Sequence, residues 1–197
     1  GASSAGNNIS FSSTVNGARA LTITAGTGSI TFSSTVGNST ALTSLATTST
    51  HASGTILTGN VTTTGTQTYT GPVTLAAATT LATTNSDLFF SSTVNGAFAL
   101  TITAGTGSIT FSSTVGNSTA LTSLATTSTH ASGTILTGNV TTTGTQTYTG
   151  PVTLAAATTL ATTNSDLFFS STVNGAFALT ITAGTGSITF SSTVGNS

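Results

Sequence analysis

The stretch "NGARALTITAGTGSITFSSTVGNS", residues 16–39, returns as "NGAFALTITAGTGSITFSSTVGNS" at residues 95–118 and again at residues 174–197. The match extends well beyond this stretch, because residues 11–118 align without a gap with residues 90–197, and only Arg19 against Phe98 differs. A fixed period of this kind is the signature of a repeat architecture, in which each unit packs on its neighbours. The repeat therefore decides the fold.

The repeat also divides the chain. Residues 1–10 match nothing else in the sequence, and we expect them to act as a joint between subunits. The first repeat covers residues 11–89, the second 90–168, and a partial third 169–197. Because the repeats of a solenoid share one core, we expect one continuous solenoid. Separate β-sandwich domains would also give a fixed period, but they would leave the shorter spacing described below unexplained.

Short runs of alternating apolar and polar residues fill each repeat. Examples are "ALTIT" at residues 20–24 and "SITFSSTV" at residues 29–36, which are rich in threonine and β-branched residues. Such runs favour half-buried strands. Turn-forming residues such as Asn16-Gly17 and Gly59-Asn60 separate the runs, and no helical spacing is visible. The sequence therefore predicts an all-β protein.

Apolar residues recur within each repeat at roughly 20-residue spacing, which is within the range of solenoid coils. Leu21, Leu42, Val61, Leu81 and Leu100 follow at intervals of 21, 19, 20 and 19, and two further ladders keep nearly the same spacing. Three ladders with one spacing predict a parallel β-helix with three faces, about 20 residues per coil and four coils per repeat. The predicted inward ladder is Leu21, Leu42, Val61, Leu81, Leu100, Leu121, Val140, Leu160 and Leu179.

Charge is almost absent from the chain. Charged residues make up 2% of it, namely Arg19, Asp87 and Asp166, and there is neither lysine nor cysteine. Without a basic patch we expect no nucleic-acid partner. Without an apolar run of about 18 residues we expect no membrane insertion. Without cysteine the chain has no disulfide and no thiolate metal site.

The repeat unit resembles a known family. The stretches "FSSTVNGAFALTITAGTGSITFSSTVG" and "GNVTTTGTQTYTGPVTLAAATTLATT" are similar to the repeats of large bacterial surface exoproteins, the filamentous-haemagglutinin-like or β-strand-repeat group. The resemblance implies a right-handed parallel β-helix, export across the outer membrane to the cell surface, and a role as an adhesin or extended fibre.

The residues that could carry chemistry are few and widely spaced. Asp87 and Asp166 stand one repeat apart, about 19 Å in a four-coil repeat, whereas a glycosidase pair needs about 5–9.5 Å. We expect each aspartate to cap its own "NSDL" turn. His51 and His130 are also one repeat apart, so they cannot share a metal. We therefore expect no catalytic, cofactor-binding or metal-binding residue, no cofactor and no enzyme activity.

The expected function is structural. A neutral β-helix suits an extracellular rod, filament or adhesive fibre whose partner is another copy of itself, with a surface or host ligand as a further partner. Phe98 and Phe177 replace Arg19 near a corner, so we expect them to face outward and make lateral contacts.

The alternative is a surface that binds ice or carbohydrate through a ladder of threonines. The candidate ladder consists of Thr22, Thr43, Thr62, Thr83 and Thr101. Threonine's preference for strands also accounts for such a ladder without a ligand.

Overall fold

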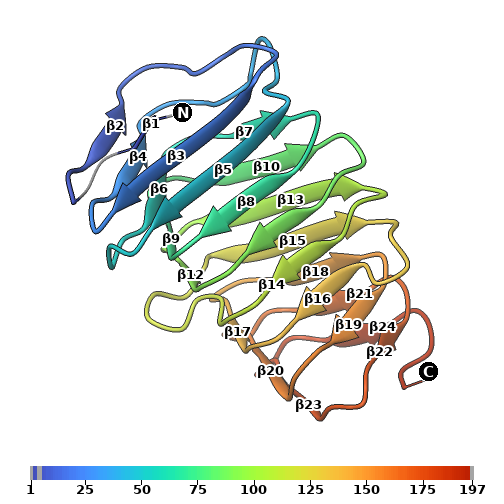
Figure 1. Ribbon diagram of the computed structural model, residues 1–197. Coiled ribbons are helices and arrows are strands. Elements are labelled where there is room, and N and C mark those ends of the chain that lie inside the picture. Colours follow the sequence, from blue (N-terminus) through green and yellow to red (C-terminus); the bar gives the residue numbers. More distant parts are fainter. Residues whose placement is uncertain (1, 4–5, 196–197) are drawn as a thin grey trace.

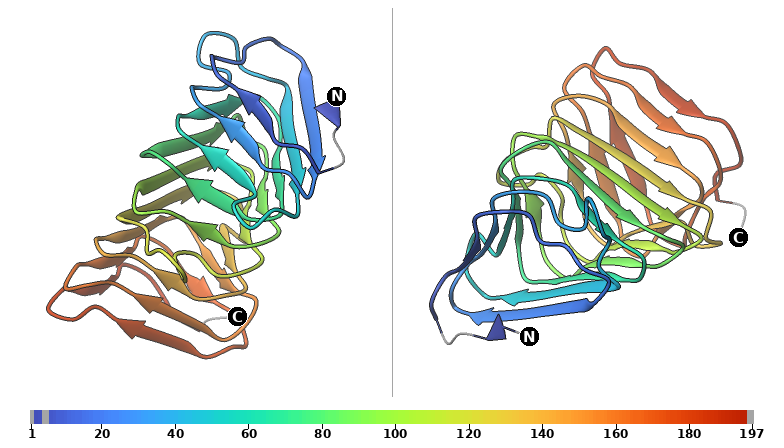
Figure 2. Two further views of the ribbon diagram at one scale, coloured as in Figure 1. Left: turned by 90° about the vertical axis from the view of Figure 1, so that its left-hand side faces the viewer. Right: turned by 90° about the horizontal axis from the view of Figure 1, so that it is seen from above.

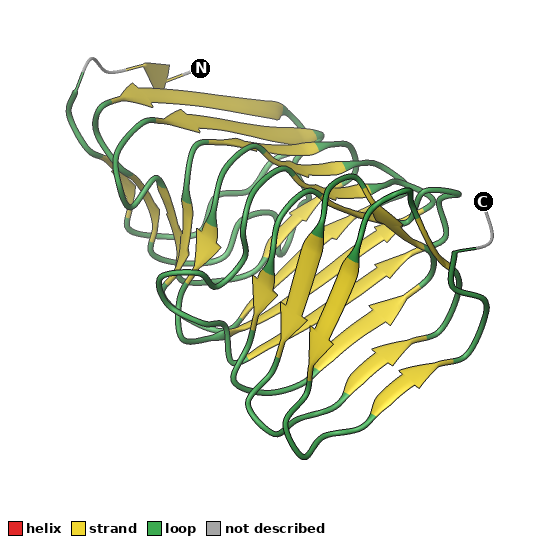
Figure 3. Ribbon diagram, turned by 90° about the horizontal axis from the view of Figure 1, so that it is seen from below, coloured by secondary structure: helices red, strands yellow, loops and turns green. Residues whose placement is uncertain are grey.

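The computed structural model describes residues 2–3 and 6–195, which form a solenoid of short parallel strands (Figure 1). No helix occurs among them. Strands pair with strands one coil away: Ile9 pairs with Ile30, and Gln67 with Leu88. The predicted fold class, an all-β parallel β-helix, is confirmed. Views from other sides show the coils stacked in a rod with strands on three sides (Figures 2 and 3).

Face 1 is a single nine-stranded sheet that runs the length of the described rod. Its strands are β1 (Ala2–Ser3), β3 (Ala20–Gly26), β5 (Ser44–Ser49), β8 (Gln67–Thr70), β11 (Leu88–Phe90), β14 (Ile109–Phe111), β16 (Thr134–Leu136), β19 (Val152–Leu154) and β22 (Val173–Asn174).

Face 2 consists of a five-stranded and a three-stranded sheet. The backbone bridges from Val94 to Val115 and from Val115 to Val140 join the two. The strands are β2 (Ile9–Phe11), β4 (Ile30–Phe32), β6 (Thr55–Leu57), β9 (Val73–Leu75), β12 (Val94–Asn95), β17 (Val140–Thr141), β20 (Thr158–Ala161) and β23 (Leu179–Thr182).

Face 3 is a seven-stranded sheet. Bridges from Val15 to Val36 and from Val36 to Val61 extend it toward the first coil. Its strands are β7 (Val61–Thr63), β10 (Thr79–Thr83), β13 (Ala99–Gly105), β15 (Ser123–Ser128), β18 (Gln146–Thr149), β21 (Leu167–Phe169) and β24 (Ile188–Phe190).

The corners between faces are tight, and glycine is needed where coils touch. Gly71 has φ +107°, and a Cβ atom at this position would clash with the carbonyl oxygen of Ser49 in the neighbouring coil. Gly150, its equivalent one repeat later, has the same geometry against Ser128. A larger residue would both strain the backbone and force the two coils apart. Coil stacking thus requires glycine at positions 71 and 150.

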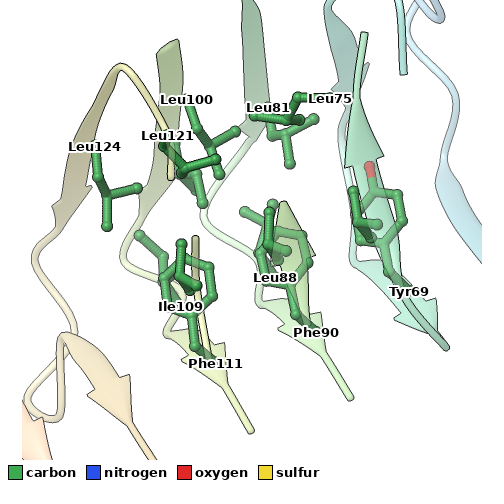
Figure 4. Close-up of a cluster of buried hydrophobic side chains, with 14 of the residues drawn as sticks. Tyr69, Leu75, Leu81, Leu88, Phe90, Leu100, Ile109, Phe111, Leu121 and Leu124 are labelled. Atoms are coloured by element: carbon green, nitrogen blue, oxygen red, sulfur yellow. The ribbon is translucent and has the colours of Figure 1, made fainter. Parts of the chain in front are cut away.

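The core is a column of like residues on like residues. The ring of Tyr69 stacks on that of Phe90 with centroids 5.1 Å apart, and Phe90 stacks on Phe111 at 5.0 Å (Figure 4). The rings are nearly parallel, with interplanar angles of 7° and 6°. Each strand turns alternate side chains inward, so its inner residues meet their counterparts in the coils above and below. This stacking is what allows identical repeats to share one core.

The number of coils per repeat differs from the sequence-based expectation of four. One repeat contains eleven strand positions, from β2 through the Val15 bridge, β3, β4, the Val36 bridge and β5 to β10, before β11 begins the next. Distributed over three faces, eleven positions make three and two-thirds turns. The cause is unequal coil length. On face 2, Ile30 pairs with Thr55 and Thr55 pairs with Val73, so the first of these two coils is much longer than the second.

Equivalent residues of successive repeats therefore lie on different faces. Phe11 lies in β2 on face 2, Phe90 in β11 on face 1, and Phe169 in β21 on face 3. Each of the three is in an aromatic stack, because the ring partners repeat with the sequence. The repeat thus advances along the rod and also turns by one face.

The members of the predicted core ladder all contribute to the core. Leu21 and Leu179 are partly buried against it. The fully enclosed members are Leu42, Val61, Leu81, Leu100, Leu121, Val140 and Leu160.

The stacking of that ladder, however, is corrected by the structure. Leu21 pairs with Leu45 instead of Leu42, and Leu42 forms its bridge with Thr63 instead of Val61. The near-regular spacing in the sequence hid these shifts, because two inward leucines, Leu42 and Leu45, stand close together at one corner. The register therefore follows the corners and not the mean spacing.

The solenoid begins before the repeat boundary. Ile9 and Ser10 pair with Ile30 and Thr31 as part of β2, and β1 pairs with β3. The expected joint of residues 1–10 therefore includes residues that already belong to stacked coils. Residues 1, 4 and 5 lie outside the described residues, so the part of the joint that they form is not covered.

Candidate functional site

The two aspartates hold corners together across coils. Oδ1 of Asp87 accepts hydrogen bonds from the backbone N–H of Ser108 (2.7 Å) and from its hydroxyl (3.0 Å). Oδ1 of Asp166 accepts from the N–H of Ser187 at 2.7 Å. We expected each aspartate to cap its own turn, but the bonded serine is 21 residues away in the next coil.

The same corner position holds an asparagine in the first coil. Oδ1 of Asn8 accepts from the N–H of Ser29 at 2.9 Å, and Asn8 is the residue that precedes Asp87 by one repeat. A neutral amide oxygen thus makes the same backbone contact as the carboxylate.

The aspartates are also far from each other around the rod. Asp87 lies between β10 on face 3 and β11 on face 1, and Asp166 lies between β20 on face 2 and β21 on face 3. The two carboxylates therefore stand at different corners and form no carboxylate pair.

The histidines form hydrogen bonds within their own turns. Nδ1 of His51 accepts from the N–H of Ser53 at 3.0 Å, and the N–H of His51 donates to Oγ of Ser49 at 3.1 Å. His130 makes the equivalent bonds in the second repeat. Both imidazoles are half-buried. Within residues 2–3 and 6–195, no three His, Cys, Asp or Glu side chains gather where they could hold a metal ion.

A buried polar cluster inside the rod was not anticipated from the sequence. The amide Nε2 of Gln67 donates to the carbonyl oxygen of Ala82 at 2.9 Å. The hydroxyl of Tyr69 donates to Oε1 of the same glutamine at 2.9 Å. Gln146 and Tyr148 repeat the arrangement on another face. The signal that could have revealed it is the alternation in "QTY", which turns both polar side chains inward.

This cluster is structural. Burial raises the pKa of the Tyr69 hydroxyl well above its ordinary value of about 10, and does the same for Tyr148. Every buried side-chain nitrogen and oxygen in the described part of the chain has a hydrogen-bond partner. No unpaired interior group is therefore left among these residues to receive a ligand.

The threonine ladder drawn from the sequence does not form. Thr22 pairs with Ala46, and Thr62 with Ala82. Thr83 is buried, and its hydroxyl donates to a backbone carbonyl oxygen. The prediction that Thr83 belongs to a surface ladder is therefore wrong. The columns follow the register of the coils and not the mean spacing.

The surface threonines instead form grids on two faces, each built from three adjacent strands. On face 3 the strands contribute Thr101 and Thr103, Ala125 and Thr127, and Thr147 and Thr149. On face 1 they contribute Thr22 and Thr24, Ala46 and Thr48, and Thr68 and Thr70. In each grid, the residues that pair across the three strands form two columns along the rod. One column is threonine on all three strands, and the other has alanine on its middle strand.

The large apolar side chains on the surface include four phenylalanines, which form two sets of equivalent positions one repeat apart. Phe98 is 39% exposed and Phe177 50% exposed, as the arginine at the equivalent position led us to expect. Phe89 and Phe168 are each 38% exposed, and sequence reasoning missed them because they lie in "LFF" runs that look buried. Only the middle residue of each run points outward.

No pocket is present in the part of the chain that the structure describes, and no helix there is long and apolar enough to span a membrane. Among known proteins, no family model, no curated protein and no solved structure matches this chain. Outward threonine grids, exposed phenylalanines and the coil stack itself are thus the features on which a function can be argued.

Proposed function

We propose that the chain is an extracellular structural protein, a rod or adhesive fibre of the bacterial cell surface that grows by stacking β-helical coils. The observation that carries this proposal is the continuity of the core: Tyr69, Phe90 and Phe111 stack ring on ring across coils that belong to two successive repeats. A core of this kind accepts any number of repeats, because each coil needs only its neighbours. The number of repeats then determines the length of the rod.

The chemistry of the surface supports the same proposal. The chain's three charged residues, Arg19, Asp87 and Asp166, are all exposed, and the aspartates are engaged in holding corners. Asp87 and Asp166 stand at different corners, and so do His51 and His130. A neutral rod of this kind is suited to contact with other copies of itself through its ends and through Phe98 and Phe177, and with a surface or host ligand.

The test is to measure length against repeat number. Chains with two, four and six copies of residues 90–168 inserted in frame should form rods of constant width whose length grows by about 17.6 Å per repeat, from three and two-thirds turns of about 4.8 Å. Small-angle scattering gives both the length and the cross-section. Compact particles whose width grows with repeat number would contradict the proposal.

A second candidate function is binding to a neutral, regular surface such as ice or crystalline carbohydrate. The observation that favours it is the unbroken threonine column on face 3, formed by Thr103, Thr127 and Thr149, with its equivalent on face 1. Thermal hysteresis and co-sedimentation with insoluble polysaccharide test it. Replacement of Thr103 and Thr127 with lysine should weaken either activity, and unchanged binding would exclude this face as the site.

A further inference from the structure

Apart from Phe190 in the last strand β24, the exposed phenylalanines of the described residues occur in two pairs along the rod. In the first pair, Phe89 lies in β11 on face 1, and Phe98 follows nine residues later, between β12 on face 2 and β13 on face 3. In a three-sided coil, the corner between faces 2 and 3 lies opposite face 1. The two rings therefore stand on opposite sides of the rod within one coil.

The next repeat carries the same pair, turned by one face. Phe168 lies in β21 on face 3, and Phe177 lies between β22 on face 1 and β23 on face 2, the corner opposite face 3. This second pair is about 17.6 Å further along the rod, from the strand spacing of about 4.8 Å. One chain thus presents two opposed aromatic pairs that point along two different directions across the rod.

The start of the rod carries neither ring. Ser10, in β2 on face 2, stands where Phe89 stands one repeat later, and Arg19 stands where Phe98 does. The backbone is the same in both copies: the carbonyl oxygen of Arg19 accepts from the N–H of Thr43 at 3.1 Å, and that of Phe98 accepts from the equivalent N–H at 3.0 Å. The corner therefore accepts arginine or phenylalanine without a change of fold, and the choice acts on the surface.

We propose that these pairs are lateral contacts between copies of this chain, in which the corner phenylalanine of one rod packs against the face phenylalanine of the next. An aromatic group on one side and its counterpart on the opposite side make a contact that repeats from rod to rod without closing. The two directions lie at an angle to each other across the rod, so the rods assemble side by side into a bundle. No such contact forms in the third direction, because Arg19 places an exposed charge at the equivalent corner near the start of the rod.

The occupant is a second copy because each copy carries the face ring and the corner ring in the same coil, so the rings of two neighbouring rods meet at the same height. Phe89 stands in an outward row between Thr68 and Thr110, so the facing surface is uncharged. The formal net charge of the chain is −1, which leaves little electrostatic repulsion between rods. This inference rests on the proposed function of a rod, and it adds which sides of the rod associate.

The chain itself supplies the variants that test the contact. Phe98→Arg with Phe177→Arg gives both corners the arginine that stands at position 19. Phe89→Ser with Phe168→Ser gives both faces the serine that stands at position 10. Both double variants therefore use residues that the fold already holds at equivalent positions. Sedimentation velocity on the whole chain measures association, and negative-stain electron microscopy shows its form. We expect the unmodified chain to form bundles of parallel rods, and each double variant to need at least about tenfold more protein to associate.

A variant that gains association completes the test. Ser10→Phe with Arg19→Phe adds a contact in the third direction, so we expect this variant to associate at a lower protein concentration than the unmodified chain. Unchanged far-ultraviolet circular dichroism and unchanged rod dimensions in small-angle scattering would show that the variants act on the contact and leave the rod intact.

Two results would overturn the inference. One is that unmodified rods stay single at high concentration, and the other is that the arginine variants associate as readily as the unmodified chain. Loss of the rod shape in the unmodified chain would instead overturn the proposed function.

Discussion

Tyr69 and Tyr148 occupy the same position of the repeat, yet Tyr69 lies in β8 on face 1 and Tyr148 in β18 on face 3. Both hydroxyls donate to a glutamine two residues earlier, at 2.9 Å in each case. The local environment is therefore copied while its direction from the rod axis changes. A surface feature that each repeat carries once is displayed on the three sides of the rod in turn.

The interior of the rod should not tolerate charge. Leu121 is fully buried, so Leu121→Asp places an unpaired carboxylate in the core and should lower the free energy of unfolding by about 3–5 kcal/mol. Asn117→Asp, on an exposed loop nearby, adds the same charge and is the matched control. Urea unfolding measures both. Equal stability of the two variants would mean that Leu121 does not point inward.

The glutamine–tyrosine cluster should depend on both members. Tyr69→Phe removes the donor to Oε1 of Gln67 and leaves that buried oxygen unpaired, which should cost about 1–3 kcal/mol. The ring stack on Phe90 is preserved, so the loss reports the hydroxyl alone. Chemical denaturation measures the cost.

The second copy of the cluster provides an internal comparison for this measurement. Tyr148 donates to Gln146 as Tyr69 does to Gln67, so Tyr148→Phe should have a similar cost. An unchanged free energy of unfolding in both variants would show that the hydroxyl contributes nothing to the stability of the core.

Alkaline pH should unfold the rod through the same tyrosines. Burial raises the pKa of both hydroxyls in the folded chain, whereas in the unfolded chain they ionise at about pH 10. Above that pH the unfolded chain binds fewer protons than the folded chain, so their contribution to stability is fully present below about pH 10 and falls as the pH rises. The expected slope is about 1.4 kcal/mol per pH unit for each tyrosine. Urea unfolding from about pH 8 to about pH 12 measures it. Tyrosinate absorbance that appears before unfolding would contradict this assignment.

The corner aspartates should be replaceable by asparagine but not by alanine. Asp87→Asn keeps an oxygen for the N–H of Ser108, as Asn8 does for Ser29, and should leave stability unchanged. Asp87→Ala removes the acceptor and should cost about 1 kcal/mol. Thermal unfolding of the two variants side by side separates hydrogen bonding from charge. A loss of stability in Asp87→Asn would show that the carboxylate's charge matters.

The sequence alone was sufficient for the fold class, because alternation identifies strands and the regular recurrence of apolar residues identifies stacked coils. It was not sufficient for the register. Leu42 and Leu45 both face inward at one corner, and nothing in their chemistry says which one continues the stack from Leu21. The register depends on corner lengths, which are set by backbone contacts between coils such as that of Gly71 with Ser49.

Only part of the candidate surfaces could be predicted from the sequence. Phe98 was identified as outward because Arg19 stands at the equivalent position, a comparison that the repeat itself provides. Phe89 has no such marker within the exact repeat, since its equivalent, Ser10, lies in the segment before residue 11. The threonine grids could not be predicted, because their columns follow the strand register between coils, in which Thr101 pairs with Ala125.

The winding of three and two-thirds turns per repeat is tested most directly by disulfide mapping, because the chain has no cysteine of its own. Thr101 pairs with Ala125 in the structure, whereas the ladder expected from the sequence, in which Thr43 follows Thr22, would place Thr122 beside Thr101. Two double variants, Thr101→Cys with Ala125→Cys and Thr101→Cys with Thr122→Cys, should be oxidised under identical conditions and mapped by non-reducing peptide mass spectrometry. We expect an intramolecular disulfide in the first variant and free thiols in the second. A disulfide that forms only between positions 101 and 122 would contradict it.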